Sequence, residues 1–405
     1  MWSYVMSFIS DNLNRIKPSA TMVITAKAAQ LKREGKDVIG LSAGEPDFDT
    51  PDHVKEAAIE AIKKGYTKYT NVEGIPELRQ AIVDKFKKDN NLDYTINDVI
   101  VGTGGKQILY NALISSININ DEVIIPAPYW VSYPDMTLLA GGTPVIVSCS
   151  ADTGFKLTAE ALEKVITNKS KWLILNSPSN PTGACYSKDE LNAIAEVVRQ
   201  HKNLYVMTDD IYEYIVYDNF KFHTFAQVAP DLKDRTLTVN GVSKSHCMTG
   251  WRIGYAVGPT ILIKAMIKIQ GQSTSNASSI SQYAALAGIG GSNDFLKPCL
   301  QAFDERRKYV FNRLNNIPGI SCILPEGAFY AYPNVSGLIG KKTSKGITLN
   351  NDTEIVEWLL ETGEVAAVPG VAFGLEPFFR VSYATSLELL KDAMDRIERS
   401  VSSLA

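Results

Sequence analysis

The sequence predicts an α/β fold in which helices cover both faces of a mainly parallel sheet. Strand-like apolar runs alternate with amphipathic stretches through the middle of the chain, and this alternation favours parallel strands joined by helices. The apolar runs are 98–104, 122–128, 143–149, 172–178, 204–210 and 236–241. Helical patterns lie between them at 105–117, 158–166 and 188–202. The last of these predicts one buried helical face, because apolar residues recur at three, four and seven positions, at Leu191, Ile194, Ala195 and Val198.

From about residue 294 the pattern changes to that of a smaller α+β lobe. A long charged helix leads into short apolar stretches, and further helices are expected at 352–362 and 386–401. A chain of 405 residues is longer than one hydrophobic core usually accommodates, so two lobes are expected. We predict an N-terminal arm and segment at 1–50 that packs on the small domain. The large domain is expected at 51–293 and the small C-terminal domain at 294–405.

Composition excludes several classes of function. With 41 Lys and Arg against 44 Asp and Glu, the net charge of −3 favours neither nucleic acid nor an anionic membrane surface as a partner. No apolar run reaches the roughly 18–20 residues of a membrane span, and the first residues do not resemble a secretion signal. Five widely spaced cysteines and four histidines without metal-ligand spacing predict neither a disulfide framework nor a metal site. We therefore expect a cytoplasmic protein.

Polar segments rich in Gly and Pro follow five of the predicted strands. In an open parallel sheet, ligands bind at the carboxyl ends of the strands. The sequence therefore predicts a binding site at this edge, built from GTGGK (102–106), PAPYW (126–130), NSPSNPTG (176–183), TDD (208–210) and NGVSK (240–244).

Two of these segments indicate a nucleophile and an anion site. Lys244 directly follows a strand, and desolvation there would lower its pKa and make its amine a nucleophile. Arg252, eight residues later, could bind a phosphate with its guanidinium fork. GTGGK opens a helix, whose free N–H groups and dipole favour phosphate. The alternatives are a solvated lysine with a structural arginine, and a plain tight turn.

Other candidate residues have both a chemical and a structural interpretation. Asp209 could cap a helix or hold the positive charge of a heterocycle nitrogen, and Tyr212 could donate to a ring oxygen. Trp130 could stack on a planar cofactor or only pack, and Asn180 could belong to a purely structural turn. Arg380 lies in an apolar strand, where its guanidinium needs a carboxylate partner from the protein or from a substrate.

Taken in order, these motifs resemble the class I aminotransferases of pyridoxal-phosphate (PLP) fold type I. The resemblance runs from 17–21 to 381–386, nearly the whole chain, and is strongest to the bacterial aspartate aminotransferase subgroup with prephenate-active members. The matching stretches are KPSAT, LSAGEPDFDTP, KYTNVEGIPELR, GGKQ, PYWVSYPDM, NSPSNPTGA, DDIYEY, SKSHCMTGWRIGY, EGAFY, VPGVAFG and FRVSYATS. One departure is Asp210, where many relatives carry Glu.

The resemblance implies a PLP-dependent transferase fold and a role for each cofactor-binding residue. Lys244 would form the Schiff base and then shuttle the substrate's proton. Around the ring, Asp209 would pair with the pyridine nitrogen and Trp130 would stack on the face, while the 3-oxygen would be bound by Tyr212 and Asn180. The phosphate would be held by Arg252, by backbone N–H groups of Gly105 and Lys106, by Ser243, and by Tyr69 reaching from a second subunit.

The resemblance also implies how substrates are recognised. The α-carboxylate would be held by Arg380 with Gly44 and Asn180. A distal carboxylate would be read by Lys106 with Ser19 and Thr21. Lys17 matches a lysine linked to prephenate use, although a solvated surface lysine is the alternative. A homodimer follows as well, because the sites of this family lie at the subunit interface.

The expected reaction is ping-pong transamination between L-aspartate and 2-oxoglutarate, giving oxaloacetate and L-glutamate. Conversion of prephenate to L-arogenate is a second expected activity. The alternatives are an aromatic or alanine aminotransferase, or a fold type I carbon–sulfur lyase, decarboxylase or C–C synthase. A PLP-binding regulatory domain is disfavoured, because no basic helix-turn-helix segment is recognised in the sequence.

Overall fold

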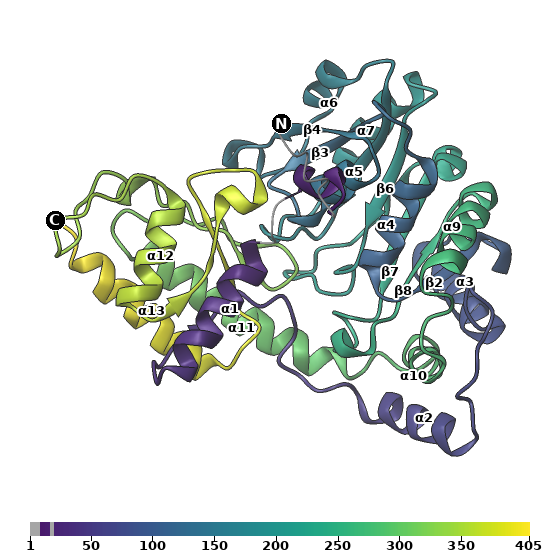
Figure 1. Cartoon of the computed structure of the whole chain (residues 1–405), viewed down its shortest axis with the longest axis horizontal. Coiled ribbons are helices and arrows are strands. Elements are labelled where there is room, and N and C mark those ends of the chain that lie inside the picture. Colours follow the sequence, from purple (N-terminus) through teal and green to yellow (C-terminus); the bar gives the residue numbers. More distant parts are fainter. Residues whose placement is uncertain (1–8, 17–19) are drawn as a thin grey trace, which may run out of the picture.

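A seven-stranded sheet forms the centre of the larger lobe of the computed structural model, which describes residues 9–16 and 20–405 (Figure 1). All neighbouring strands are parallel except β8, which runs antiparallel to both β2 and β7. In spatial order the strands are β2 (Val99–Gly102), β8 (Gly254–Val257), β7 (Thr236–Gly241), β6 (Tyr205–Asp209), β5 (Ser170–Asn176), β3 (Glu122–Ala127) and β4 (Thr143–Ser148).

Each predicted apolar run overlaps one strand of this sheet, and the seventh strand, β8, was not predicted. The segment after Lys244 was interpreted only as a loop with binding residues. The structure places a four-residue strand at its end, inserted between β2 and β7. All four residues of β8 are buried, as are those of the predicted strand β2, but the run of β8 directly follows a motif that was interpreted through its binding residues. The mainly parallel α/β prediction is confirmed.

Helices cover both faces of the sheet, because alternate strand residues point to opposite sides. Ile125, Ile174 and Val239 share one core with the helices of the first face, while Ile124 and Leu173 belong to a core on the other side. The first face carries α4 (Gly105–Ser116), α5 (Ser132–Leu139) and α9 (Thr260–Ser273). The opposite face carries α2 (Asp52–Lys63), α3 (Pro76–Asn90), α6 (Ala159–Val165), α7 (Lys188–Gln200), α8 (Phe225–Val228) and α10 (Ser279–Gly290).

The C-terminal elements build a second core with two small sheets. Antiparallel β11 (Val368–Pro369), β12 (Phe379–Ser382) and β9 (Tyr330–Ala331) form one sheet, and β1 (Ile39–Gly40) pairs in parallel with β10 (Val365–Ala366) in the other. The helices here are α1 (Ala20–Arg33), α11 (Leu296–Asn315), α12 (Asp352–Thr362) and α13 (Leu387–Ser402). Residues 39–40 therefore join the C-terminal elements, while the domain boundaries at 50 and 293 stay a prediction.

Within the described ranges, 9–16 and 20–405, none of the helices combines the length and apolarity that crossing a bilayer requires.

The start of α4 lies directly against strand β8. A Cβ atom on Gly254 would stand only 2.2 Å from the backbone nitrogen of Gly105 and 2.4 Å from the carbonyl carbon of Gly104. Gly104 itself has φ +83°, a left-handed conformation that a residue with a side chain rarely adopts. Strand and helix can therefore touch only through glycine, and this contact determines where the first turn of α4 points.

Replacing Gly254 should consequently destabilise the protein. We expect Gly254→Ala to lower the free energy of unfolding by about 2–3 kcal/mol, because the added methyl group must displace backbone. Urea unfolding followed by circular dichroism measures the change. Gly290→Ala is the matched control, since its Cβ would meet nothing within 4 Å, and it should change stability by less than about 0.5 kcal/mol. Equal stability of the two variants would contradict the close contact.

Candidate active site

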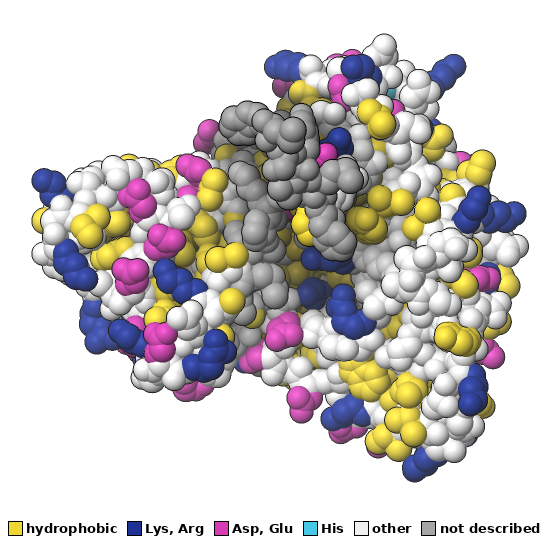
Figure 2. Space-filling view, in the orientation of Figure 1, with side chains coloured by type: hydrophobic (Ala, Val, Ile, Leu, Met, Phe, Trp, Pro, Cys, Tyr) yellow, Lys and Arg dark blue, Asp and Glu magenta, His cyan; other side chains and the backbone are white. Residues whose placement is uncertain are grey.

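A cavity of about 320 Å³ opens at the carboxyl edge of the large sheet. It receives side chains or backbone from all five segments that the sequence singled out. The predicted residues that line it are Gly44, Gly105, Lys106, Trp130, Asn180, Asp209, Tyr212, Ser243, Lys244 and Arg252. In the space-filling view, basic side chains gather in the hollow near the centre of this face (Figure 2).

Asp209 is the buried acid of the cavity, with only 7% of its surface exposed at the end of β6. Tyr133 Oη donates a hydrogen bond to Asp209 Oδ2 at 2.7 Å. Burial raises the pKa of Asp209 to about 6, against the opposing effects of the Tyr133 hydrogen bond and of the nearby Lys244 charge. A positive group placed beside this carboxylate would remove the cost of its ionisation.

Tyr133 was not assigned a role from the sequence. It lies within the quoted stretch PYWVSYPDM, three residues after Trp130, and its ring meets that of Trp130 edge-on at 5.4 Å. Only the docking of α5 on the sheet brings its hydroxyl group to Asp209. The segment at the start of α5 therefore supplies both the aromatic ring of Trp130 and, from Tyr133, the hydrogen-bond donor of the buried acid.

Lys244 lies half-buried in the cavity, and its Nζ donates to the carbonyl oxygen of Gly44 at 2.5 Å. Desolvation, with smaller contributions from the charges of Arg380 and Arg252, lowers the pKa of Lys244 to about 8. The amine therefore loses its proton at a lower pH than an ordinary lysine does, and the unprotonated amine is the state that attacks a carbonyl group.

Arg380 is a buried cation without a carboxylate partner in the described chain. Its Nη1 donates to Asn180 Oδ1 at 2.8 Å and its Nη2 to the carbonyl oxygen of Ser42 at 2.6 Å, while its Nε has no hydrogen-bond partner. Burial lowers the pKa of Arg380. The sequence analysis expected a carboxylate partner for Arg380 from either the protein or a substrate. The described residues provide no such carboxylate, so a carboxylate of a ligand would satisfy the guanidinium.

Tyr212 meets a second residue that sequence reasoning missed. The hydroxyl groups of Tyr212 and Tyr330 lie 2.7 Å apart, and the ring of Tyr330 lies 4.6 Å from the Arg380 guanidinium. Burial raises the pKa of Tyr212 well above its ordinary value, so its hydroxyl stays a proton donor. The stretch EGAFY contains Tyr330, but its contact with Tyr212 exists only because the segment before Tyr330 pairs with the segment after Tyr212, where Val216 forms a β-bridge with Gly327. A Cβ atom on Gly44 would stand 2.9 Å from Tyr330 Oη, which explains the glycine there.

The start of α4 forms an anion site. Its N-cap, Gly104, provides no side-chain hydrogen bond, so the first N–H groups, including those of Gly105 and Lys106, remain for a ligand. The Arg252 guanidinium lies over the same point, because a Cβ on Gly104 would be 2.5 Å from Arg252 Nη2. Ser243 lines the cavity close by. This arrangement suits a phosphate group.

The predicted distal subsite is described only in part. Lys106 Nζ lies 4.9 Å from the centre of the Trp130 ring, and it has no carboxylate partner among the described residues. Desolvation and the charge of Arg252 lower the pKa of Lys106. Lys17 and Ser19 lie outside the described residues, and for Thr21, in α1, only the backbone is described. Tyr69 is 91% exposed and does not line the cavity of its own chain.

The donor set fits PLP. Asp209 suits a positive ring nitrogen, Trp130 offers an aromatic face, and Lys244 provides an amine for an aldehyde. The helix start with Arg252 suits the phosphate dianion.

Comparison with known proteins agrees with this geometry. The sequence profile of the family described as "Aminotransferase class I and II" matches residues 36–397. The chain belongs to this family. It is therefore an aminotransferase that uses PLP, and its fold is the type I fold of PLP-dependent transferases.

Relatives of this aminotransferase match it over nearly their whole length. The aspartate/prephenate aminotransferase of Cereibacter sphaeroides is 57% identical over 400 residues, which cover 99% of this chain and all of the relative. A probable aspartate/prephenate aminotransferase of Rickettsia felis is 56% identical and covers 99% of this chain and 98% of its own. Among solved structures, the aspartate aminotransferase of Rhizobium meliloti superposes with a TM-score of 0.96 at 52% identity, covering 98% of this chain and 99% of its own. The Thermus thermophilus aspartate aminotransferase with maleate has a TM-score of 0.91 at 41% identity, covering 98% and 100%.

The depressed pKa of Lys244 predicts how PLP attachment depends on pH. A lysine whose pKa is about 8 is mostly protonated at pH 7 and mostly free at pH 9, so the rate of covalent attachment to PLP-free protein should rise about tenfold over this range. Stopped-flow absorbance of the yellow band, with borohydride trapping, measures this rate. Lys244→Ala should bind PLP without borohydride-stable attachment at any pH. A rate independent of pH between 7 and 9 would contradict the assignment.

Proposed function

We propose that this aminotransferase exchanges the amino group between L-aspartate and 2-oxoglutarate, giving oxaloacetate and L-glutamate by a ping-pong route. Conversion of prephenate to L-arogenate is a second proposed activity. The observation that carries the proposal is the pair of cations Arg380 and Lys106, which have no carboxylate partner in the described chain. A dicarboxylic substrate supplies a carboxylate for each of them, as do aspartate, glutamate and prephenate. The names of the relatives point to the same substrates.

The reaction divides among the residues of the cavity. When bound, PLP supplies an electron sink that stabilises negative charge at the α-carbon of an amino acid. Lys244 Nζ removes the proton from that carbon, and its lowered pKa suits a general base near neutral pH. Asp209 keeps the ring nitrogen protonated, so that negative charge is drawn toward it. Arg380, with Asn180 and Gly44, orients the substrate by its α-carboxylate.

The remaining site residues bind rather than react. Tyr212 and Asn180 donate to the ring 3-oxygen, and Trp130 packs on the ring face. The phosphate is held by Arg252, by Ser243 and by the backbone N–H groups of Gly105 and Lys106. For the distal carboxylate, the proposed ligands of the substrate are the side chains of Lys106, Ser19, Thr21 and, for prephenate, Lys17.

We also propose a cytoplasmic homodimer in which Tyr69 completes the phosphate site of the second subunit. Tyr69 is 91% exposed on its own chain, so its side chain is free to contact a second subunit. Ile59, Ile62 and Tyr66 are also exposed nearby in sequence, in and after α2. An apolar surface around a residue that the site needs is typical of a subunit interface.

A single half-reaction tests the function. Mixing the PLP-loaded protein with glutamate or aspartate alone should convert the yellow absorbance to the near-ultraviolet pyridoxamine form. One equivalent of 2-oxoglutarate or oxaloacetate should appear per site. A carbon–sulfur lyase would instead return to the starting absorbance and release pyruvate and ammonia, and that result would overturn the proposal.

The role of Lys106 can be tested by substrate selectivity. Lys106→Ala should lower kcat/KM for aspartate and glutamate by about 30- to 150-fold, which corresponds to the loss of a charged hydrogen bond of about 2–3 kcal/mol. Alanine and phenylalanine lack the distal carboxylate, so their kcat/KM should change by less than about threefold. Steady-state kinetics with all four amino acids measures the difference.

Lys171→Ala is the matched control, because it removes another lysine from an aromatic face, that of Tyr205 outside the cavity. It should leave all four constants unchanged. Equal losses for alanine and aspartate in Lys106→Ala would exclude Lys106 as the specificity group.

A further inference from the structure

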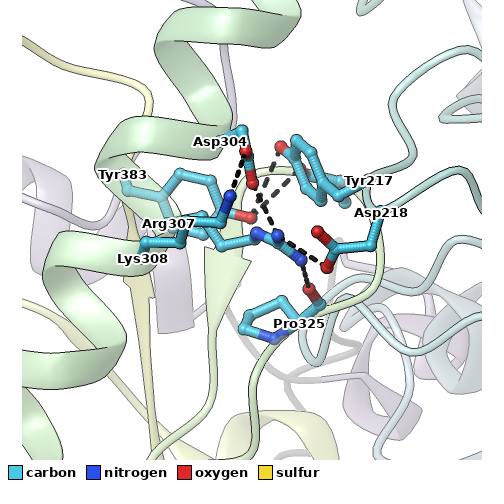
Figure 3. A network of polar contacts seen from close by, with 8 residues as sticks. Tyr217, Asp218, Asp304, Arg307, Lys308, Pro325 and Tyr383 are labelled. Atoms are coloured by element: carbon cyan, nitrogen blue, oxygen red, sulfur yellow. Dashed lines mark hydrogen bonds and ion pairs between the residues drawn. The ribbon is translucent and has the colours of Figure 1, made fainter.

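Arg307 of α11 is a fully buried arginine outside the cavity, with 1% of its surface exposed. Figure 3 shows its guanidinium at the centre of a polar network. Arg307 Nη1 donates to the carbonyl oxygen of Pro325 at 2.7 Å. Its Nη2 donates to Asp218 Oδ2 at 2.8 Å and to Asp304 Oδ1 at 2.5 Å. The guanidinium also lies 4.4 Å from the centre of the Tyr217 ring.

Through these contacts Arg307 holds two segments that are far apart in the sequence. Residues 215–218 lie in the connection between β6 and β7 of the large sheet, and residues 325–328 belong to the C-terminal elements. Their backbones run together, with Tyr217 N donating to Glu326 O at 3.0 Å and Ala328 N donating to Ile215 O at 2.9 Å. The side chains add to this pairing, because the hydroxyl group of Tyr217 donates to the carbonyl oxygen of Ala328.

Each of the two segments leads directly to one of the cavity tyrosines. Ile215 N donates to the carbonyl oxygen of Tyr212 at 2.8 Å, which closes the turn that carries Tyr212. Tyr330 follows Ala328 by two residues along the other segment. The two hydroxyl groups meet at 2.7 Å in the cavity, and the Tyr330 ring faces Arg380. Arg307 thus contacts the two paired segments, 215–218 and 325–328, that carry this pair of tyrosines.

The backbone of the two paired segments is packed so closely at Gly327 that it has little room to move. A Cβ atom on Gly327 would stand 2.7 Å from Pro178 and 2.8 Å from the carbonyl oxygen of Ile215. Gly327 N also donates to Gly183 O at 2.8 Å, in the segment that carries Asn180. Close-packed backbone of this kind transmits a displacement instead of absorbing it.

We propose that Arg307 is a positioning residue of the aminotransferase reaction, which holds the Tyr212–Tyr330 pair in register with Arg380. It touches neither substrate nor cofactor and acts through the paired segments 215–218 and 325–328. The proposal rests on the proposed roles of Tyr212 and Arg380 at the ring oxygen and the α-carboxylate.

The chemistry of the network explains why an arginine is needed. Its planar fork reaches three acceptors in different directions, two carboxylates and a carbonyl, while a lysine has a single point of charge. Asp304 is shared with Lys308, whose Nζ donates to Asp304 Oδ2 at 2.6 Å. The two carboxylates are therefore balanced by two cations. Removing the arginine would also leave the carbonyl oxygen of buried Pro325 without the hydrogen bond that Arg307 donates.

The test is a double-mutant cycle between Arg307→Lys and Tyr330→Phe in the PLP-loaded protein. Arg307→Lys should raise KM for aspartate by about tenfold while kcat changes by less than about threefold, because binding groups are displaced and the reacting groups remain. The pH at which the yellow band titrates should move by about half a unit, since Tyr212 contacts the ring oxygen. The combined loss in kcat/KM should be smaller than the product of the two single losses, as expected for residues that act through one another.

Arg313→Lys is the matched control in the same helix, since Arg313 also binds two carboxylates, those of Asp395 and Glu398. It should leave KM, kcat and the band titration unchanged. If Arg307→Lys fails to fold, Asp218→Asn replaces it in the cycle. That variant removes the negative charge of one partner of Arg307, on a side chain that is 59% exposed, and it should raise KM by about threefold.

Two results would overturn the proposal: unchanged constants and titration in the folded variant, or losses that multiply independently with those of Tyr330→Phe. Failure of the proposed function is distinguishable, because it would appear as absence of the glutamate half-reaction in the unmodified protein. The band titration of the Arg307 variant reports on positioning in either case.

Discussion

Asp209 and Arg380 are buried charges of opposite sign, yet neither forms an ion pair with another residue of the described chain. Burial opposes the ionisation of both, and the pKa of Asp209 rises to about 6 while that of Arg380 falls. A buried charge without a partner is expensive. A ligand that placed a positive ring nitrogen at the acid and a carboxylate at the guanidinium would relieve this cost.

The fold brings these two charges together from two different sheets. Asp209 ends β6 of the large sheet, whereas Arg380 belongs to β12 of a small sheet. The contact between Tyr212 and Tyr330 joins the two sides at the cavity, and the Arg307 network joins them behind it. The anion site depends on the large sheet alone, because the glycines of β8 and α4 allow strand and helix to touch.

The sequence predicted the large sheet well, because its buried strands are continuous apolar runs separated by amphipathic helices. It predicted the small sheets only as a lobe of mixed class. The runs around Tyr330 and Val365 form strands of two residues, too short for any periodicity to mark them. Strand β8 was missed because its short run directly follows the segment that was interpreted through Lys244 and Arg252. Short elements are determined by their neighbours rather than by their own pattern.

The sequence by itself determined the family, the cofactor and the residue types at the sheet edge, because Lys244, Asp209 and Arg252 lie in motifs that local chemistry explains. Only the tertiary structure decided which groups those residues meet. Tyr133 joins the site because α5 packs on the large sheet, and Tyr330 joins it because residues 215–218 and 325–328 pair. No spacing along the chain records these contacts. Hydrogen bonds between distant elements depend on three-dimensional docking, whereas strand-end loops of a parallel sheet share one edge by topology alone.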